Sequence, residues 1–326
     1  MNEHSKGDSD YQEIVSNFEK LDFVSLWEGR DKVNLLEKKI LTHFLKSSDG
    51  RRILEIGPGN GRLTGTIKAY ASEFVATDIN MSFLNEVKLK YGLNDAFYVA
   101  SNLYHLPFAN NSFSSVVMIR VFNFISRPLS VIEELSRVLV NGGHVLISIS
   151  PRPSLSTLID DLKYIAFSDH SKGQKKRSIT FSNKDMTPVH PASYPTFAFR
   201  SSFIRSLFKE AGFKEVGCVS SGLEDYSILR AIPAGSLFNI GIIFRSVPIF
   251  PTMFFHFQKG NGNQTSLRVI NDILQCPSCS SKLPIEAESG KIECAKCRFV
   301  GFTSDGIIDL TYVPQQAKVA KDGQWQ

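Results

Sequence analysis

The sequence predicts an α/β fold: a doubly wound, Rossmann-like sheet of seven strands followed by a small C-terminal module. Between residues 52 and 149, short apolar segments alternate with segments of helical periodicity, which is typical of parallel strands joined by crossover helices. The first apolar segment leads through a glycine-rich turn into a helix, as expected for the first crossover of such a sheet. Four cysteines in two close pairs near the C-terminus predict the module.

The individual elements follow from the same patterns. Apolar residues at helical spacing predict one or two helices within residues 11–46. The predicted strands are residues 52–56, 73–78, 97–100, 115–119, 144–149, 216–220 and 226–232. Helices are expected to begin near Gly61 and to cover residues 80–91, 129–139 and 201–212. Residues 151–200 hold several prolines and a basic run, so we predict an insertion there.

The bulk composition is that of an ordinary globular protein, with 42% hydrophobic and 21% charged residues among 326. The net charge of +5 permits an acidic partner but does not require one. The first ten residues are polar, which indicates no secretory signal and a cytoplasmic location. The most apolar window, residues 237–257, contains an arginine and two prolines. It therefore predicts a helical cap over the sheet rather than a transmembrane segment, with peripheral contact to a membrane surface as an alternative.

The glycine-rich turn has a spacing that suits a nucleotide-like ligand. Gly57, Gly59 and Gly61 alternate directly after the first strand, and Glu55 lies two residues before them. Such a turn offers bare backbone at the start of a helix. Asp78 ends the second strand about 20 residues downstream, where a carboxylate can bind a ribose. A dinucleotide-binding fold is the alternative, but Arg62 replaces the third glycine of that pattern.

Three further motifs follow the turn: Leu106-Pro107-Phe108, Asn111-Ser112-Phe113, and Asn141-Gly142-Gly143 before the fifth strand. With them, the chain over residues 27–232 closely resembles the class I S-adenosylmethionine-dependent methyltransferases, in particular the type 11 group that acts on small molecules. The resemblance implies S-adenosyl-L-methionine as the cofactor. It also implies the cofactor-binding residues, which are Glu55, Gly57, Gly59, Gly61, Asp78, Ile79, Asn102, Leu103 and Arg120, with Arg30 as a further candidate.

Each of these residues has an expected role under the resemblance. The glycines would approach the methionine part of the cofactor, Glu55 its amino group, and Asp78 the ribose hydroxyls. Ile79 and Leu103 would contact the adenine. Asn102 stands where the family has an acid, so its amide oxygen is expected to accept from the adenine amino group. Arg120 would lie near the cofactor carboxylate, although a solvated arginine at a strand end is an equal alternative.

The cysteines Cys276, Cys279, Cys294 and Cys297 are spaced C-x2-C-x14-C-x2-C. Two such pairs place four thiolates around one metal, which suits a structural zinc with no open coordination position. Iron or a redox dithiol are the alternatives. Residues 299–310 resemble the end of zinc ribbons in small methyltransferase-activator subunits, which implies a scaffolding or docking role. We expect the ribbon to be separable, with its folding dependent on metal.

The predicted domains are N-terminal helices (1–46), a methyltransferase domain (47–232, with the insertion 151–200), a cap and linker (233–272) and the zinc ribbon (273–312). The predicted function is methyl transfer to an unidentified small or lipid-like acceptor, because the insertion and the cap are rich in aromatic and aliphatic residues. The alternative is an RNA or protein acceptor that docks on the ribbon. His170, His190 and Tyr194 are candidate bases, with surface or loop-packing roles as the alternative.

Overall fold

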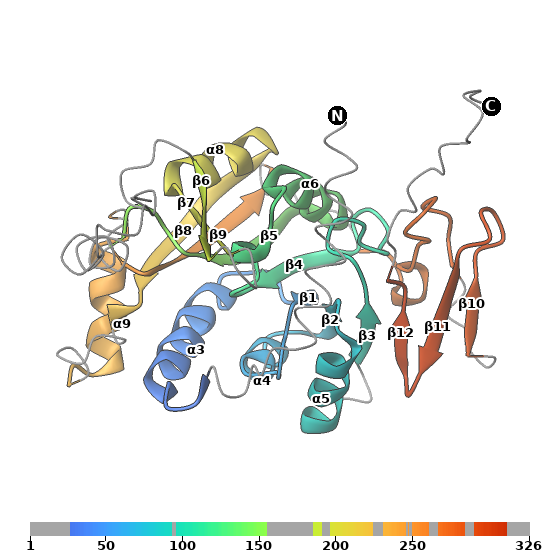
Figure 1. Ribbon diagram of the computed structural model, residues 1–326, viewed down its shortest axis with the longest axis horizontal. Helices are drawn as coiled ribbons and strands as arrows, with labels where there is room; N and C mark the ends of the chain where they lie inside the picture. Colours follow the sequence, from blue (N-terminus) through green and yellow to red (C-terminus); the bar gives the residue numbers. More distant parts are fainter. Residues whose placement is uncertain are drawn as a thin grey trace, which may run out of the picture.

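The computed structural model describes residues 27–92, 96–154, 185–190, 196–223, 231–245, 247, 250–260, 267–283 and 290–311. It shows a mixed α/β fold in which helices cover both faces of one large sheet (Figure 1). The strand order in this sheet is β10-β11-β12-β3-β2-β1-β4-β5-β9-β8. The predicted doubly wound, Rossmann-like architecture is therefore confirmed.

Most strands of the central part of the sheet lie close to their predicted positions, but the fifth begins at Leu139 instead of His144 and so includes Asn141-Gly142-Gly143, which were expected to precede it. The strands are β1 (Arg52–Ile56), β2 (Glu73–Asp78), β3 (Ala96–Ala100), β4 (Phe113–Met118), β5 (Leu139–Ile149) and β8 (Phe213–Ser221). Neighbouring strands from β3 to β5 pair in parallel. Because parallel strands carry their ligand sites at the carboxyl ends, this register fixes the edge at which a site is expected.

The described helices form two layers. They are α3 (Asp31–Leu45), α4 (Thr64–Lys68), α5 (Met81–Tyr91), α6 (Pro128–Val138), α8 (Ser201–Glu210) and α9 (Ala234–Ile243), with short 3-10 turns η1 (Phe122–Phe124) and η5 (Ile270–Asp272). Helices α6 and α8 lie over one face of the sheet, and α3, α4 and α5 over the other (Figure 1). Each layer buries its own apolar cluster against the sheet, because apolar residues recur at helical spacing on one side of each long helix.

The last strand of the central sheet is β9 (Thr252–Lys259), which runs antiparallel between β5 and β8. The strand predicted at residues 226–232 lies mostly outside the described residues, and the described Ala231 and Ile232 are not in a strand. Strand β9 instead falls within the segment predicted as cap and linker. Every residue from Thr252 to Phe257 is buried because the strand has partners on both sides and helices on both faces. Such a strand reads as a continuous apolar run and cannot be distinguished from a buried helix by periodicity.

The sheet has ten strands rather than the predicted seven because the cysteine module extends it. The module contributes β10 (Lys291–Glu293), β11 (Val300–Ser304) and β12 (Ile307–Asp309), and β12 pairs in parallel with β3. This pairing covers what would otherwise be the open edge of β3. The module also packs against the central sheet, since Cys276 and Cys294 belong to the same apolar cluster as Val99 and Phe108, and its separability stays a prediction.

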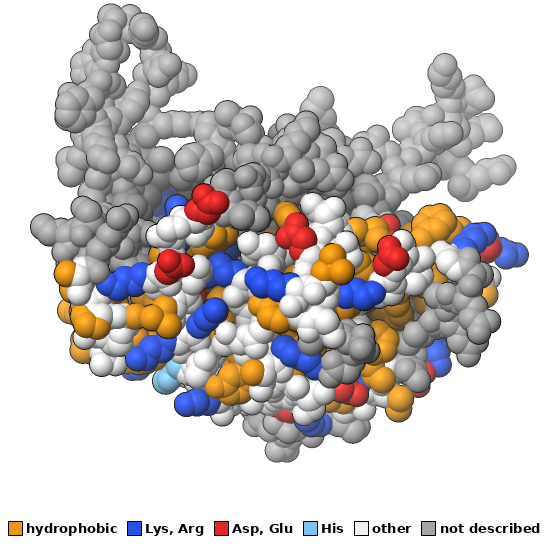
Figure 2. Space-filling view, turned by 90° about the horizontal axis from the view of Figure 1, so that it is seen from below, with side chains coloured by type: hydrophobic (Ala, Val, Ile, Leu, Met, Phe, Trp, Pro, Cys, Tyr) orange, Lys and Arg blue, Asp and Glu red, His pale blue; other side chains and the backbone are white. Residues whose placement is uncertain are grey.

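Strands β6 (Met186–His190) and β7 (Thr196–Phe199) form a separate two-stranded sheet within the predicted insertion. His190 ends β6 opposite Thr196, but its side chain lies outside the described part of the chain, as do His170 and Tyr194 altogether. None of the described helices combines the length and the apolar character needed to cross a bilayer. On the face shown in Figure 2, basic side chains are interleaved with apolar and acidic ones instead of gathering in one patch.

Candidate functional site

A cavity of about 190 Å³ lies at the carboxyl ends of β1, β2, β3 and β4. Its wall is mostly apolar and includes Trp27, Phe83, Tyr104, Val121 and Phe124. Among the predicted cofactor-binding residues, Glu55, Gly57, Gly59, Asp78, Ile79, Leu103 and Arg120 line it. Gly61, Asn102 and Arg30 are not among the lining residues. The fold therefore brings most of the predicted site together at the expected edge of the sheet.

The glycine turn has a backbone that side chains would disturb. Gly57 has a φ of +68°, and a Cβ there would lie 2.3 Å from Val121 Cγ2. Gly59 has a φ of +53° but faces open space, with nothing within 4 Å of an added Cβ. The Gly57 N–H donates to Thr77 O at 2.8 Å, which fixes the start of the turn against β2. The turn thus holds its backbone in a left-handed conformation that favours glycine and leaves room beside Gly59 for a ligand.

Glu55 brings a buried carboxyl group to the cavity. The side chain is 4% exposed, and its Oε2 has no hydrogen-bond partner among the described residues. Burial raises the pKa of Glu55 to about 8; the Asp78 carboxylate adds to the shift, while Thr64 and Arg62 oppose it. A buried acceptor without a partner is costly. A ligand that donates a hydrogen bond, above all a cationic one, would remove that cost.

Asp78 ends β2 beside the glycine turn. Its Oδ1 accepts from the Asn80 N–H at 3.0 Å. Burial raises the pKa of Asp78 to about 6, and hydrogen bonds from the backbone N–H groups of Asn80, Gly59 and Ile79 oppose the rise. Asp78 is half-buried and lines the cavity. It presents acceptor oxygens to a ligand, as a ribose diol requires.

Asn102 is buried behind the cavity wall and is not one of the lining residues. It is 3% exposed, and its Oδ1 accepts from the Tyr104 N–H at 2.9 Å. Asn side chains commonly bond the backbone two residues ahead and so stabilise a local turn. The neighbouring Leu103 and Tyr104 face the cavity instead. Asn102 therefore shapes the loop that lines the cavity, and its carbonyl oxygen is already used within that loop.

Glu37 was missed by the sequence analysis, although it connects two residues of the cavity wall. This carboxylate on α3 is fully buried and forms ion pairs with Arg62 at 2.5 Å and Arg120 at 2.7 Å. Arg120 also donates to Thr252 Oγ1 at 3.0 Å, and the Trp27 ring lies 3.7 Å from the Arg62 guanidinium carbon. The available signal was an acidic residue on the apolar side of a predicted helix, which implies a buried cationic partner.

The geometry of this cluster leaves positive charge beside the cavity. Glu37 carries one negative charge, whereas Arg62 and Arg120 each carry one positive charge, and both arginines line the cavity. Arg120 has a φ of +64°, a strained conformation for a residue other than glycine, and its N–H donates to Ser148 Oγ. An anionic group of a ligand, such as a carboxylate, would balance the excess charge.

The four cysteines of the module are close enough to share one metal ion. Their Sγ atoms all lie within 4.8 Å of one another, and the Cys276–Cys297 and Cys279–Cys294 pairs are each 3.5 Å apart. Zinc with four thiolates at about 2.3 Å would separate the sulfurs by about 3.8 Å. The donor set and its spacing therefore fit a four-coordinate zinc.

The part of the chain that contains most of this site matches a known protein family. Residues 54–147 match the family model described as "Methyltransferase domain". The biotin biosynthesis bifunctional protein BioHC of Cellvibrio japonicus is 29% identical over 110 residues, which are 34% of this chain and 22% of that protein. The ubiquinone/menaquinone biosynthesis C-methyltransferase UbiE of Wigglesworthia glossinidia brevipalpis is 26% identical over 122 residues, which are 35% of this chain and 49% of that protein.

A third relative, the uncharacterized protein MJ0638 of Methanocaldococcus jannaschii, is 27% identical over 149 residues, which are 41% of this chain and 62% of that protein. The chain thus spans less than two thirds of each of these relatives. Among solved structures, it is similar to a chain of a complex containing the Haloferax volcanii Trm112 methyltransferase activator, with a TM-score of 0.48, 15% identity and coverage of 74% and 99% of the two chains. An S-adenosylmethionine-dependent methyltransferase from Thermotoga maritima gives a TM-score of 0.47, 16% identity and coverage of 73% and 96%. The match to the methyltransferase family model thus spans residues 54–147, which contain the glycine turn, Asp78 and Arg120.

Proposed function

We propose that this protein is an S-adenosylmethionine-dependent methyltransferase that acts on a small or lipid-like acceptor. The observation that carries the proposal is the unpartnered Oε2 of buried Glu55, which lines the cavity of a methyltransferase domain. S-adenosylmethionine has an ammonium group, which would supply the missing hydrogen bond and the opposite charge. The excess positive charge of Arg62 and Arg120 complements the carboxylate of the same cofactor.

The remaining residues of the wall suit the other parts of this cofactor. Asp78 would accept from the ribose hydroxyls, and the backbone beside Gly59 has room for the methionine part. Ile79 and Leu103 would contact the adenine from either side of the cavity edge. When bound, the cofactor supplies a methyl group on a positively charged sulfur. The protein then has to exclude water and hold the attacking atom of the acceptor about 3–3.5 Å from that methyl.

An apolar acceptor is supported by the aromatic part of the wall. Trp27, Tyr104 and Phe124 line the cavity, whereas its acidic side chains are those of Glu55 and Asp78, which are assigned to the cofactor. Two of the relatives also belong, by name, to the biosynthesis of biotin and of ubiquinone or menaquinone. His170, His190 and Tyr194 stay candidate bases for an acceptor that must lose a proton.

The cysteine cluster is proposed to hold one structural zinc ion. Four thiolates leave no open position for a substrate, so the metal would stabilise the ribbon and take no part in methyl transfer. Cys276 and Cys294 are buried, which would shield the zinc from solvent on one side.

Two measurements test the proposed function. Calorimetry should show S-adenosylhomocysteine binding with a Kd in the micromolar range, about −8 kcal/mol, and clearly weaker binding after Asp78→Ala. Preference for NAD in the same experiment would contradict the cofactor assignment. A tritiated-methyl assay on a cell extract, fractionated into RNA, protein, lipid and small molecules, should then place the label in the lipid or small-molecule fraction. Label in RNA or protein would instead support a macromolecular acceptor.

A further inference from the structure

The loop between β3 and β4 forms one wall of the cavity. Leu103, Tyr104 and Leu106 of this loop line the cavity, and Leu106 is 3% exposed. The loop has no strand or helix of its own between Ala100 and Phe113. Its backbone groups must therefore find their hydrogen bonds elsewhere. Where they find them decides how this wall of the cavity is held.

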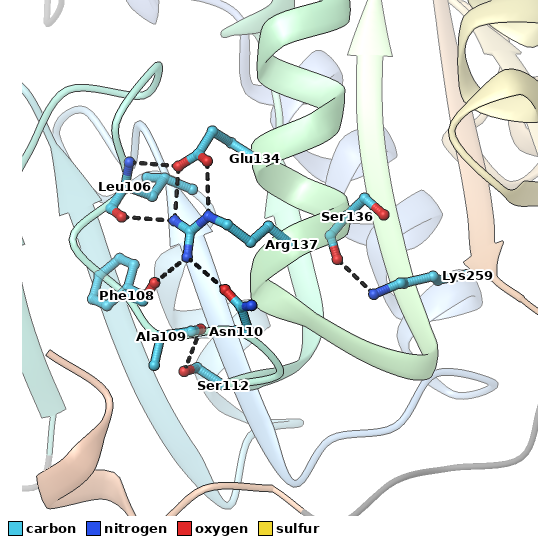
Figure 3. Close-up of polar contacts among 9 residues, drawn as sticks. All are labelled: Leu106, Phe108, Ala109, Asn110, Ser112, Glu134, Ser136, Arg137 and Lys259. Carbon is cyan, nitrogen blue, oxygen red and sulfur yellow. Dashed lines mark hydrogen bonds and ion pairs between the residues drawn. The ribbon is translucent and has the colours of Figure 1, made fainter. Parts of the chain in front are cut away.

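Helix α6 holds Leu106 of this loop through one ion pair (Figure 3), while further along the loop Pro107 O accepts from the Gln275 N–H and the Ala109 N–H donates to Ile273 O. Glu134 Oε2 accepts from the Leu106 N–H at 2.9 Å, and Arg137 Nη2 donates to the Leu106 carbonyl at 2.9 Å. Glu134 and Arg137 are themselves joined by two hydrogen bonds of 2.8 Å. Both backbone polar groups of Leu106 are thus bound to the same pair of side chains.

Arg137 reaches further along the loop. Its Nη1 donates to the Phe108 carbonyl and to Asn110 Oδ1. Together with the bonds to Glu134 and Leu106, all five N–H groups of the guanidinium are used. A lysine at this position would keep the charge but has three donors on a flexible stem, so it could not form the same set.

Helix α6 is itself fixed relative to the sheet. Lys259 at the end of β9 donates to the Ser136 carbonyl at 2.6 Å (Figure 3). It also donates to the Leu139 carbonyl at 2.8 Å, so it satisfies the carboxyl end of the helix. At the other end, the N–H groups of Ser126 and Arg127 donate to the Tyr104 hydroxyl at 3.1 and 3.3 Å. Helix α6 is thus anchored to the sheet, and its hydrogen bonds hold two cavity-lining residues, Tyr104 and Leu106, in place.

We propose that Glu134 and Arg137 are positioning residues for the cofactor cavity, which act by fixing the backbone of Leu106 and thereby one wall of the site. The inference rests on the proposed function. Neither side chain lines the cavity, so both act only through the loop. In Glu134→Gln one carboxylate oxygen becomes an NH₂ donor facing N–H donors, and in Arg137→Lys the two-pronged geometry is lost while the charge is kept.

The test compares S-adenosylhomocysteine binding by four proteins: the unsubstituted chain, Glu134→Gln, Arg137→Lys and the control Glu133→Gln. Glu133 is an exposed acid on the same helix, so its change removes the same charge without touching the loop. Charge-assisted hydrogen bonds predict about tenfold weaker binding for the first two variants. For Glu133→Gln the Kd should stay within about twofold, as is usual for a surface substitution. Binding is measured well below each unfolding midpoint, so that the folded fraction is the same.

Hydrogen exchange separates positioning from general stability. The Leu106 amide should exchange slowly in the unsubstituted protein and clearly faster in Glu134→Gln, while amides of β1 and β4 stay unchanged. Equal binding by all four proteins would overturn this inference alone, as would weaker binding with exchange raised uniformly across the sheet. Absence of S-adenosylhomocysteine binding by all four proteins would overturn the proposed function and the inference with it. If both variants fail to fold, fast exchange of the Leu106 amide in the unsubstituted protein overturns the inference, and slow exchange that slows further with S-adenosylhomocysteine supports it.

Discussion

His144 Nδ1 and His256 Nε2 lie 2.8 Å apart on the neighbouring strands β5 and β9. Both side chains are buried, at 7% and 3% exposure, and Ser48 Oγ lies 3.3 Å from the same His256 nitrogen. This environment disfavours protonation of either ring, because the added positive charge would be buried beside the other ring. Burial, together with His144 and His43, lowers the pKa of His256 to about 3, and burial lowers the pKa of His144 against an opposing effect of Asp49.

We therefore expect acid to destabilise the fold through this pair. Because the folded pKa is below the unfolded value of 6.5, the unfolded chain binds more protons and stability falls as the pH drops below about 6.5. At pH 5 the loss attributable to His256 should be about 2 kcal/mol. Glu55 and Asp78 act in the opposite direction, because their raised pKa values make the folded state bind protons. Denaturant titrations at pH 7.5 and pH 5 should therefore be made on the unsubstituted protein and on His256→Gln. Between the two pH values, the free energy of unfolding of His256→Gln should fall by about 2 kcal/mol less than that of the unsubstituted protein. Identical pH slopes for both proteins would contradict this prediction.

Cofactor binding should depend on pH through Glu55. Its pKa of about 8 means that the carboxyl is largely protonated at neutral pH and must ionise to pair with an ammonium group. Affinity for S-adenosylhomocysteine should therefore rise with pH towards 8, with release of a proton, until the ligand amine loses its own proton. Calorimetry in two buffers of different ionisation enthalpy measures that proton. Glu55→Gln should bind more weakly and release none, and a proton release that persists in this variant would assign it to another group.

Glu37→Gln should strongly destabilise the fold. The change leaves the partly buried guanidiniums of Arg62 and Arg120 without their shared counter-charge, which costs up to about 3–5 kcal/mol. Asp31→Asn is the matched control, because Asp31 is an exposed acid on the same helix. Urea unfolding measures the difference. A loss below about 1 kcal/mol for Glu37→Gln would show that the ion pairs contribute no more than exposed ones.

Metal removal should destabilise the whole chain rather than unfold the ribbon alone. Metal analysis should give one zinc per chain, and the double change Cys276→Ser, Cys279→Ser should abolish it. Because β12 pairs with β3 and Leu310 N–H donates to the Ala100 carbonyl at 2.9 Å, loss of the ribbon would reopen the edge of the sheet. Thermal unfolding should therefore show one cooperative transition at a lower Tm. Cys218→Ala, which changes the cysteine outside the cluster, should keep the zinc, and an unchanged main transition in the double variant would support the idea of a separable ribbon.

The sequence by itself determined the features that depend on neighbouring residues. The strands from β1 to β4 follow from short apolar runs, and helix α5 (Met81–Tyr91) lies within one residue of its predicted range; the Asn80 side chain accepts from Ser82 N–H before it, and Gly92 after it has a φ of +55°. The glycine turn, Asp78 and the cysteine spacing are equally local signals. Their chemistry is readable because each motif needs particular residue types at a fixed spacing.

Only the tertiary structure decided which distant segments meet. Strand β9 is recognised by its two neighbours, β5 and β8, since its residues from Thr252 to Phe257 are all buried and show no alternation between a buried and an exposed side. The pairing of β12 with β3, and the ion pairs of Glu37 with Arg62 and Arg120, join segments that are far apart in the chain. In each case the sequence supplies the groups, but the free energy that selects a partner comes from burial and hydrogen bonding, which exist only once the sheet and its helices are assembled.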